Sequence, residues 1–459
     1  MQDTDSDGIK RYILQAEEYL ARRQAYRQRV RKMRFDTIAV HGMYSLEEAL
    51  AGGQGGVIEP LIASTARAYR DSDEMEASLA YRIPAWCYSR FQNPTVFYLE
   101  ETLALLESYG CAFDASALCT ASGIAAIKQA VEPILALNAP NGGIGPINFV
   151  SSAQIYGGTF QLFNLRMAER GVRAKWVSQP ANLTEWEDLI DEDTRFLYTE
   201  MPSNPQQACT DIEAVAKLAH RFGIPLIVDA TVATPALLRP LDHGADIIVH
   251  SLTKTIGSGG GNIGGAVIAR HGVTSRHLAD DARADYAGWL KLGAFRDSGP
   301  CMAPDTAFRF LGEVRTLRIR MDHFSQNALQ VAEFLSLHPK VEQVDYLGLK
   351  NHPQHPLASR YLKMADSDKP AFGHLLSFHI RGAAQDARRF FDALERIYRA
   401  ADLGRIKSVA TIPAISTHRQ QGEEARKLAG ILPTMIRLCV GGEHPDDLLQ
   451  DLDQALNKV

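Results

Sequence analysis

The chain has 459 residues, of which 46% are hydrophobic and 22% are charged, and its formal net charge at pH 7 is -5. This composition excludes a disordered chain, a collagen and a small disulfide-stapled domain, and the length predicts roughly two to four domains. The slightly acidic balance argues against a dedicated nucleic-acid binder, and no apolar run approaches the ~18 residues of a membrane span.

Cysteine usage and the N-terminus indicate the compartment. Six cysteines are scattered along the chain without a Cys-x-x-Cys pair. This spacing favours buried thiols in a reducing compartment over a zinc site or a disulfide framework, so we expect no metal site. The chain opens with the acidic MQDTDSDG, where a secretory signal is basic, and no apolar stretch follows. We therefore expect a cytoplasmic protein without a membrane segment.

The N-terminal region begins with a basic stretch over residues 8–34 that predicts one helix. Its apolar stripe is weak and includes Leu14, Leu20 and Val30. Such a stripe favours a solvated helix, or an arm that embraces a second subunit, over nucleic-acid or membrane binding. The glycine-rich AGGQGGVIEPLI that follows predicts a loop.

From about residue 95 the chain alternates helix-like and strand-like segments. The predicted helices are 96–108, 123–137 and 211–223, and the predicted strands are 117–122, 147–152, 174–178, 194–200, 224–231, 245–254 and 264–272. This alternation predicts an α/β domain with a mostly parallel, doubly wound sheet, whose ligands bind beyond the carboxyl ends of the strands. Asp229 and the stretch 251–254 fall at such ends.

After about residue 305 the pattern changes to one long helical segment over 306–338, strands over 341–347 and 374–380, and a helix over 386–397. These elements predict a smaller α+β domain. We therefore expect three parts, listed here by residue number: an N-terminal helical arm and intersubunit segment over 1–90, a large α/β domain over 91–305, and a small C-terminal domain over 306–459.

The most informative stretch is HSLTKTIGSGGGNIGG, in which Lys254 stands at the end of a predicted strand, just after the hydroxyls of Ser251 and Thr253. A lysine that attacks an aldehyde needs a neutral amine in a positioned site, and nearby hydroxyls and backbone N–H groups can hold a phosphate. This combination favours covalent attachment of pyridoxal phosphate (PLP). Residues 259–264 also fit the G-x-G-x-x-G pattern of NAD enzymes, but a strand-like segment follows them in place of a helix.

A second residue supports the PLP interpretation. Asp229 ends an apolar strand, where an acid is costly to bury without a partner. PLP enzymes hold the pyridinium nitrogen with a carboxylate, which makes the ring an electron sink. A strand-end aspartate without a function is common, so this assignment depends on Lys254.

Seven motifs, in order from about residue 36 to the C-terminus, resemble those of the Cys/Met-metabolism family of PLP enzymes. The family includes cystathionine γ-synthase, cystathionine γ-lyase, methionine γ-lyase and O-acetylhomoserine sulfhydrylase. The motifs are YSRFQNPT, TASGIAAI, SAQIYGGTF, EMPSNP, VDAT, HSLTK and IRLCVGGEH. The resemblance implies PLP as the cofactor and the aspartate aminotransferase-like fold, PLP fold type I, with a mostly parallel sheet in the large domain.

The resemblance also implies roles for individual residues. The implied cofactor-binding residues are Lys254, Asp229, Ser251, Thr253, Gly123, Ile124, Asn204, Tyr156, Tyr88 and Arg90. Among them, Tyr156 stacks on the cofactor ring, while Tyr88 and Arg90 reach the phosphate of a neighbouring subunit. A homo-oligomer, as a dimer of dimers, is therefore implied. Catalysis falls to Lys254, which moves protons, and to Tyr156 or Tyr88, which control protonation near the leaving group.

The implied reaction breaks a Cγ–heteroatom bond in a homoserine-type or sulfur amino acid, by γ-replacement or γ-elimination. Arg437 is the implied anchor of the substrate carboxylate. The stretch LGRIKSVATIPAISTHRQ resembles the O-acetylhomoserine sulfhydrylase branch most, which favours a homoserine-type substrate. The alternative is a γ-lyase acting on methionine, cystathionine or an oxygen-linked analogue such as canavanine. An NAD-dependent oxidoreductase and a non-catalytic homologue fit the motifs less well.

Several positions depart from the family pattern, including Ile124 and Ala230. Asp402 stands where the family carries Ser or Asn near the substrate carboxylate. A carboxylate there repels the substrate's own carboxylate unless it turns away or pairs with a cation. One hypothesis is that Asp402 binds a cationic substrate side chain, such as the oxyguanidine of canavanine. The alternative is a solvated aspartate without a role.

Overall fold

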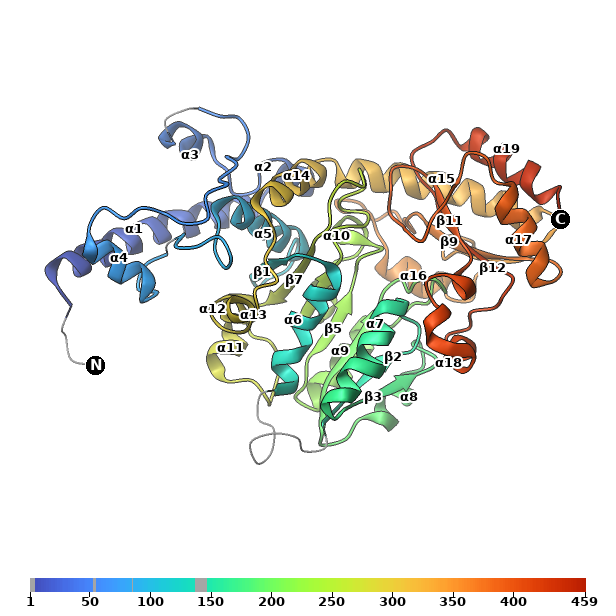
Figure 1. The fold of residues 1–459 in the computed structure, drawn as a ribbon, viewed down its shortest axis with the longest axis horizontal. Coiled ribbons are helices and arrows are strands. Elements are labelled where there is room, and N and C mark those ends of the chain that lie inside the picture. The colour runs from blue at the N-terminus through green and yellow to red at the C-terminus, as the bar shows by residue number, and fades with distance from the viewer. Residues whose placement is uncertain (1–4, 53–54, 85, 137–146) are drawn as a thin grey trace.

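The computed structural model describes residues 5–52, 55–84, 86–136 and 147–459. An N-terminal arm extends from one side of the molecule, a large sheet with its helices forms the centre, and a smaller sheet lies at the C-terminal side (Figure 1). Within the described ranges, no helix is long and apolar enough to cross a bilayer, and no three His, Cys, Asp or Glu side chains are grouped to hold a metal ion.

The central sheet has seven strands. Their order is β1 (Ala115–Thr120), β7 (Gly265–Arg270), β6 (Ile247–His250), β5 (Leu226–Asp229), β4 (Thr194–Glu200), β2 (Ile147–Ser152) and β3 (Val172–Val177). Strand β7 pairs antiparallel with both of its neighbours, and the other pairs are parallel. The predicted mostly parallel sheet is therefore confirmed. Because β7 starts directly after the G-x-G-x-x-G match, the match opens no helix, and the NAD interpretation fails.

Helices cover both faces of this sheet, which explains the continuous apolar runs of its central strands. Ile227 and Ile247 pack into one core cluster, which includes side chains of α6 (Gly123–Ala136). Val228 and Ile248, the next residues along the same strands, pack into a second cluster with α5 (Pro94–Glu107). Alternate residues of each strand thus bury on opposite faces, and the strands deliver their carboxyl ends to one edge of the sheet.

The second sheet has five strands in the order β10 (Tyr398–Arg399), β11 (Val409–Thr411), β12 (Met435–Cys439), β9 (Leu375–Ile380) and β8 (Val341–Asp345). Its core includes side chains of α15 (Leu317–Leu337), α17 (Ala384–Ala393) and α19 (Pro445–Leu456). This arrangement confirms a smaller α+β part. The boundaries at residues 90 and 305 stay predictions.

The remaining α-helices lie on the arm and in the segments between the strands. They are α1 (Asp7–Val30), α2 (Phe35–His41), α3 (Leu46–Ala51), α4 (Ser72–Leu79), α7 (Gly157–Gln161), α8 (Leu183–Leu189), α9 (Ile212–Arg221), α10 (Thr234–Leu237), α11 (Asp280–Ala284), α12 (Tyr286–Leu292), α13 (Ala294–Ser298), α14 (Pro304–Val314), α16 (His355–Tyr361) and α18 (Gly422–Leu428). The last residue of the predicted 123–137 helix, and residues 53–54 of the predicted glycine-rich loop, lie outside the described residues. The cysteines are free thiols, and most of them are buried, as expected.

The predicted helix over 306–338 is wrong in one respect, because the chain forms two helices, α14 and α15. At the junction the Glu313 carbonyl accepts hydrogen bonds from the Thr316 hydroxyl and the Arg320 guanidinium. The Thr316 N–H bonds the same carbonyl at 3.3 Å, three residues along the chain, whereas a continuous α-helix pairs a carbonyl with the N–H four residues along. Apolar spacing alone does not show this change.

The predicted helix over 8–34 also ends early. Helix α1 stops at Val30, and the Arg31 side chain leaves it to donate a hydrogen bond to the Cys111 carbonyl at 3.0 Å. The expected apolar stripe is only partly right: Val30 is buried, whereas Leu14 and Leu20 are 62% and 47% exposed. The helix therefore ends four residues before the predicted boundary at residue 34.

Candidate active site

A cavity of about 200 Å³ opens at the carboxyl ends of β5 and β6, between the two sheets. The residues expected from the sequence that line it are Gly123, Ile124, Tyr156, Asn204, Asp229, Ser251, Thr253, Lys254, Asp402 and Arg437. Strand β5 ends at Asp229 and the neighbouring β6 ends just before Ser251, so the large sheet itself brings Asp229 close to the segment 251–254.

Lys254 lies in the turn that follows β6, where its N–H bonds the Ser251 carbonyl at 3.1 Å. Its ammonium nitrogen, Nζ, is 3.0 Å from Oδ1 of Asp402, whose other oxygen accepts a hydrogen bond from Arg405. Burial opposes ionisation of Asp402, but Arg405 and Lys254 hold the pKa of its carboxyl below the ordinary value. The Asp402 carboxylate is therefore paired with cations and does not turn away from the cavity.

Asp229 lines the cavity and has 7% of its surface exposed. Its carboxylate accepts hydrogen bonds from the Thr231 N–H at 3.0 Å and the Tyr198 hydroxyl at 3.3 Å. Burial raises the pKa of the Asp229 carboxyl, because neither of these neutral donors replaces a counter-ion. A protonated ring nitrogen is the kind of group that this carboxyl fits.

The other end of the cavity suits a phosphate. Helix α6 begins at Gly123, and a helix N-terminus offers unpaired backbone N–H groups to an anion. A Cβ built at Gly123 meets the Ser251 Cβ at 2.6 Å, so only glycine allows this approach. The Thr253 hydroxyl is engaged elsewhere, because it bonds both the N–H and the carbonyl of Gly264.

Tyr156 and Asn204 are held by a residue that the sequence analysis did not single out. The carboxylate of Glu200, at the end of β4, accepts the backbone N–H groups of Tyr156 and Asn204, each at 2.8 Å. Burial, followed by the nearby Asp229, raises the pKa of Glu200 well above its ordinary value. Glu200 is the first residue of the EMPSNP motif and the last residue of a buried strand. An acidic residue at a strand end is the pattern that pointed to Asp229, and the same pattern could have pointed to Glu200.

Arg437 projects from β12 and is 1% exposed. Its guanidinium bonds the Asn204 side-chain oxygen at 3.2 Å and the backbone carbonyl of Asp402. Its third nitrogen, Nε, has no hydrogen-bond partner among the described residues. Burial lowers the pKa of Arg437, as expected for a cation that lacks a paired carboxylate.

Tyr88 and Arg90 do not line this cavity. They lie on the arm, where Arg90 stacks over the Tyr88 ring at 5.5 Å and donates a hydrogen bond to the Arg296 carbonyl. Tyr88 is 45% exposed. A role at the pocket of their own chain is therefore not supported, and their expected role at a neighbouring subunit stays a prediction.

Comparisons with known proteins give consistent relatives. The family profile described as "Cys/Met metabolism PLP-dependent enzyme" matches residues 36–457. The chain is 34% identical to an O-acetyl-L-homoserine sulfhydrylase of Leptospira meyeri, over 94% of this chain and 98% of that protein. It is 32% identical to an L-methionine gamma-lyase of Fusobacterium nucleatum, over 88% of this chain and 94% of that protein.

A solved structure agrees in fold. The crystal structure of an O-acetylhomoserine (thiol)-lyase from Campylobacter jejuni, described with a pyridoxyl-lysine phosphate residue, matches with a TM-score of 0.82 and 32% identity. The match covers 93% of this chain and 100% of that one.

Fold and site together define a PLP-dependent enzyme of fold type I. The chain belongs to the Cys/Met-metabolism family of these enzymes, and its cofactor is PLP. The residues present fit that group: a buried carboxyl without a counter-ion suits the ring nitrogen, the start of α6 suits the phosphate, and Lys254 stands in the same cavity.

Proposed function

We propose that the protein breaks a Cγ–heteroatom bond in a homoserine-type or sulfur amino acid, with γ-replacement as the main reaction. The observation that carries this proposal is the joint position of Lys254 and Arg437, which are linked through Asp402. One cavity thus holds an amine that can move protons and a guanidinium that can anchor a carboxylate. The sulfhydrylase relatives support a homoserine-type substrate.

Each residue has a defined task in this proposal. Arg437 binds the α-carboxylate of the substrate through its planar fork, which has an unused nitrogen. Lys254 takes the proton from Cα and returns it further along the side chain. PLP, when bound, supplies the electron sink that makes this proton removable. Tyr156, held in place by Glu200, stacks against the cofactor ring and assists protonation near the leaving group.

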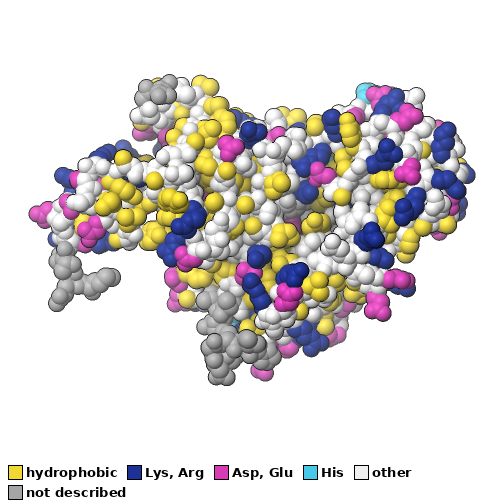
Figure 2. All heavy atoms as spheres, in the orientation of Figure 1, with side chains coloured by type: hydrophobic (Ala, Val, Ile, Leu, Met, Phe, Trp, Pro, Cys, Tyr) yellow, Lys and Arg dark blue, Asp and Glu magenta, His cyan; other side chains and the backbone are white. Residues whose placement is uncertain are grey.

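The remaining cofactor contacts belong, in this proposal, to a second copy of the chain. Tyr88 and Arg90 complete the phosphate end of the partner's cavity, which requires a homo-oligomer and favours a dimer of dimers. Hydrophobic side chains gather on the arm (Figure 2). The exposed ones include Leu14, Leu20, Leu46, Leu50, Val57, Ile58, Leu61, Met75 and Leu79. An apolar surface of this kind is typical of protein interfaces.

A product assay tests the reaction. The purified protein is given O-acetylhomoserine with and without sulfide, and separately methionine, cystathionine and canavanine. Sulfide-dependent formation of homocysteine supports γ-replacement, whereas release of 2-oxobutanoate without sulfide supports γ-elimination. Absence of both products from all four amino acids contradicts the proposal. The free thiols support a cytoplasmic location, which fractionation of the source cells checks.

Elimination from a cationic substrate is the second candidate, because the cavity wall carries the carboxylate of Asp402. Arg405 holds that carboxylate in place, so a guanidino side chain can pair with it while Lys254 acts as a neutral base. Asp402→Asn should then lower kcat/KM for canavanine about tenfold more than for O-acetylhomoserine, since a charged pair is lost. Equal losses on the two substrates exclude this candidate.

A further inference from the structure

Helix α1 lies outside the segment that the family profile matches, which begins at residue 36. It is nonetheless one of the longest helices of the described chain and runs from the body of the molecule along the arm to α4 (Figure 1). At ~1.5 Å per residue, a helix of this length spans about 36 Å as a stiff rod. Its two ends make different contacts.

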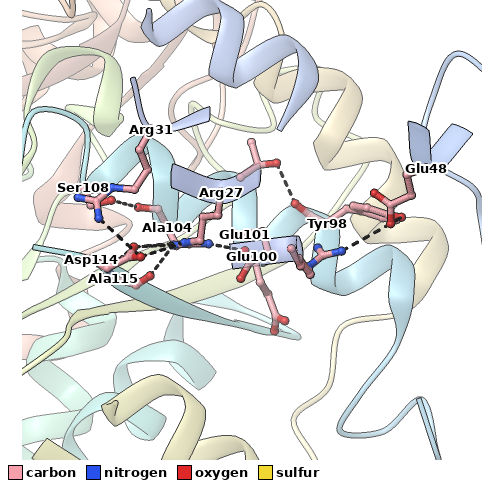
Figure 3. Close-up of polar contacts among 12 residues, drawn as sticks. Arg27, Arg31, Glu48, Tyr98, Glu100, Glu101, Ala104, Ser108, Asp114 and Ala115 are labelled. Atoms are coloured by element: carbon pink, nitrogen blue, oxygen red, sulfur yellow. Dashed lines mark hydrogen bonds and ion pairs between the residues drawn. The ribbon is translucent and has the colours of Figure 1, made fainter. Parts of the chain in front are cut away.

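The C-terminal end is fixed to the large domain by one buried arginine. The Arg27 guanidinium donates to Asp114 at 2.8 Å and to the Ala115 carbonyl at 2.8 Å, and it pairs with Glu101 (Figure 3). Arg27 is 6% exposed. We call this group, Arg27 with Glu101, Asp114 and the Ala115 carbonyl, the Arg27 clasp.

The N-terminal end of α1 packs against α4. The Tyr12 hydroxyl donates to Asp71 at 2.7 Å, and the Ser6 hydroxyl donates to Asp73 at 2.8 Å. Ile9 and Tyr12 are buried there. Helix α4 has eight residues, and a helix this short is marginal in water without tertiary support. The packing surface of α1 supplies that support.

Helix α4 in turn is tied to the segment that carries Tyr88. The Cys87 thiol contacts the Ser78 carbonyl of α4 at 3.6 Å, and Tyr88 forms a β-bridge with Ala66. Arg67, next to Ala66, forms an ion pair with Glu74 of α4 at 2.7 Å. Contacts therefore run without a gap from the Arg27 clasp through α1 and α4 to Tyr88.

We propose that α1 is a strut that holds the Tyr88–Arg90 segment in position for the partner's cavity, with Arg27 as a positioning residue. The inference rests on the proposed function, in which that segment serves the second copy. Its consequence is directional: loosening the Arg27 clasp in one subunit weakens cofactor binding in the other. A purely local role makes the opposite prediction, because the clasp adjoins β1, which leads to Gly123 in its own cavity.

Hybrid oligomers separate these outcomes. Two copies with different affinity tags are co-expressed and purified through both tags. The first copy, the cavity donor, carries Arg90→Ala and keeps Lys254. The second copy, the arm donor, carries Lys254→Ala and keeps Arg90. In this proposal, only the cavity of the first copy then combines Lys254 with an intact arm. The visible absorbance of lysine-bound PLP then reports only the cavity of the first copy, and a PLP titration gives its dissociation constant. Activity is recorded as a second readout.

Arg27→Met is placed on the arm donor or on the cavity donor in otherwise identical hybrids. We expect about tenfold weaker PLP binding when it is on the arm donor, in the range of coupling between distant parts of a protein, and little change on the cavity donor. Arg27→Lys on the arm donor should recover part of the loss, since the charge remains but the fork is gone. Arg22→Met, at an exposed arginine of the same helix, is the matched control and should change nothing.

Two results contradict the proposed role of α1 but not the contact between subunits. One is an equal loss of PLP affinity with Arg27→Met on the arm donor and on the cavity donor. The other is no loss with either. A different result contradicts the proposed function itself. If the hybrid without any change at Arg27 neither binds PLP nor turns over substrate better than an Arg90→Ala homo-oligomer, the arm does not act between subunits, and the strut falls with it. Size-exclusion chromatography with light scattering confirms that each hybrid keeps its oligomeric state.

Discussion

Two buried arginines, Arg437 in the cavity and Arg27 in the arm, have different partners. The difference separates an arginine that can bind a ligand from one that stabilises the fold. The Arg437 guanidinium donates to a side-chain amide oxygen and to a backbone carbonyl, and its Nε has no partner among the described residues. Burial lowers the pKa of Arg437. For Arg27 burial acts in the same direction, but Glu101 and Asp114 prevail and raise its pKa. A cation without a carboxylate is prepared for a ligand, whereas a cation with two carboxylates holds the fold together.

The comparison predicts its largest effect at the cavity. Lys254→Ala should reduce kcat by about 10³-fold, because it removes the group that moves protons, while the unfolding midpoint stays near that of the native protein. Steady-state kinetics and urea unfolding measure the two quantities. Loss of the visible absorbance of lysine-bound PLP should accompany the change. Retained absorbance together with retained turnover contradicts the role given to Lys254.

Arg437 should show a large effect on substrate binding. Arg437→Met should raise KM by about 100-fold, since the substrate carboxylate loses its charged, desolvated partner. Arg437→Lys should restore only part of that loss, because an ammonium lacks the planar fork. An unchanged KM in both variants shows that the carboxylate binds elsewhere and removes the contrast with Arg27.

The arm should respond in stability. Arg27→Met should lower the free energy of unfolding by about 3 kcal/mol, because it leaves the Asp114 and Glu101 carboxylates without their cation. Arg22→Met, at an exposed arginine, should stay within about 0.5 kcal/mol of the native protein. Urea unfolding at neutral pH checks both values, and equal values for the two variants break the comparison.

The smallest expected effect is the pH dependence of the difference in unfolding free energy between the native protein and Arg27→Met. Burial opposes ionisation of Asp114, but Arg27 holds the pKa of its carboxyl below the ordinary value. The stability from this pair is therefore fully present above about pH 4, the unfolded pKa, and is lost as the pH falls through the lower folded value. The native protein and Arg27→Met should converge in urea midpoint as the pH drops below about 4. A constant gap shows that the pair does not set the difference.

Much of the fold and of the cavity followed from local patterns. Apolar runs that end in a polar residue placed β5 and β6 and identified Asp229 and Lys254, because a strand buried on both faces must be apolar along its whole length. Glu200 ends a strand in the same way, so the same signal was available for it. The family motifs supplied Gly123, Ile124, Tyr156, Asn204 and Arg437, whereas the sequence did not point to other lining residues, such as Leu403 and Thr417.

What the sequence determined by itself was the order of the strands along the chain, the residues at their ends and hence the chemistry of one edge of the sheet. These depend on neighbours a few positions apart, which hydrophobic spacing records. Only the tertiary structure decided that Asp402 pairs with Lys254 and that Arg27 meets Asp114. Each of these contacts joins residues far apart in the chain, and their burial and charge balance exist only after the chain has folded.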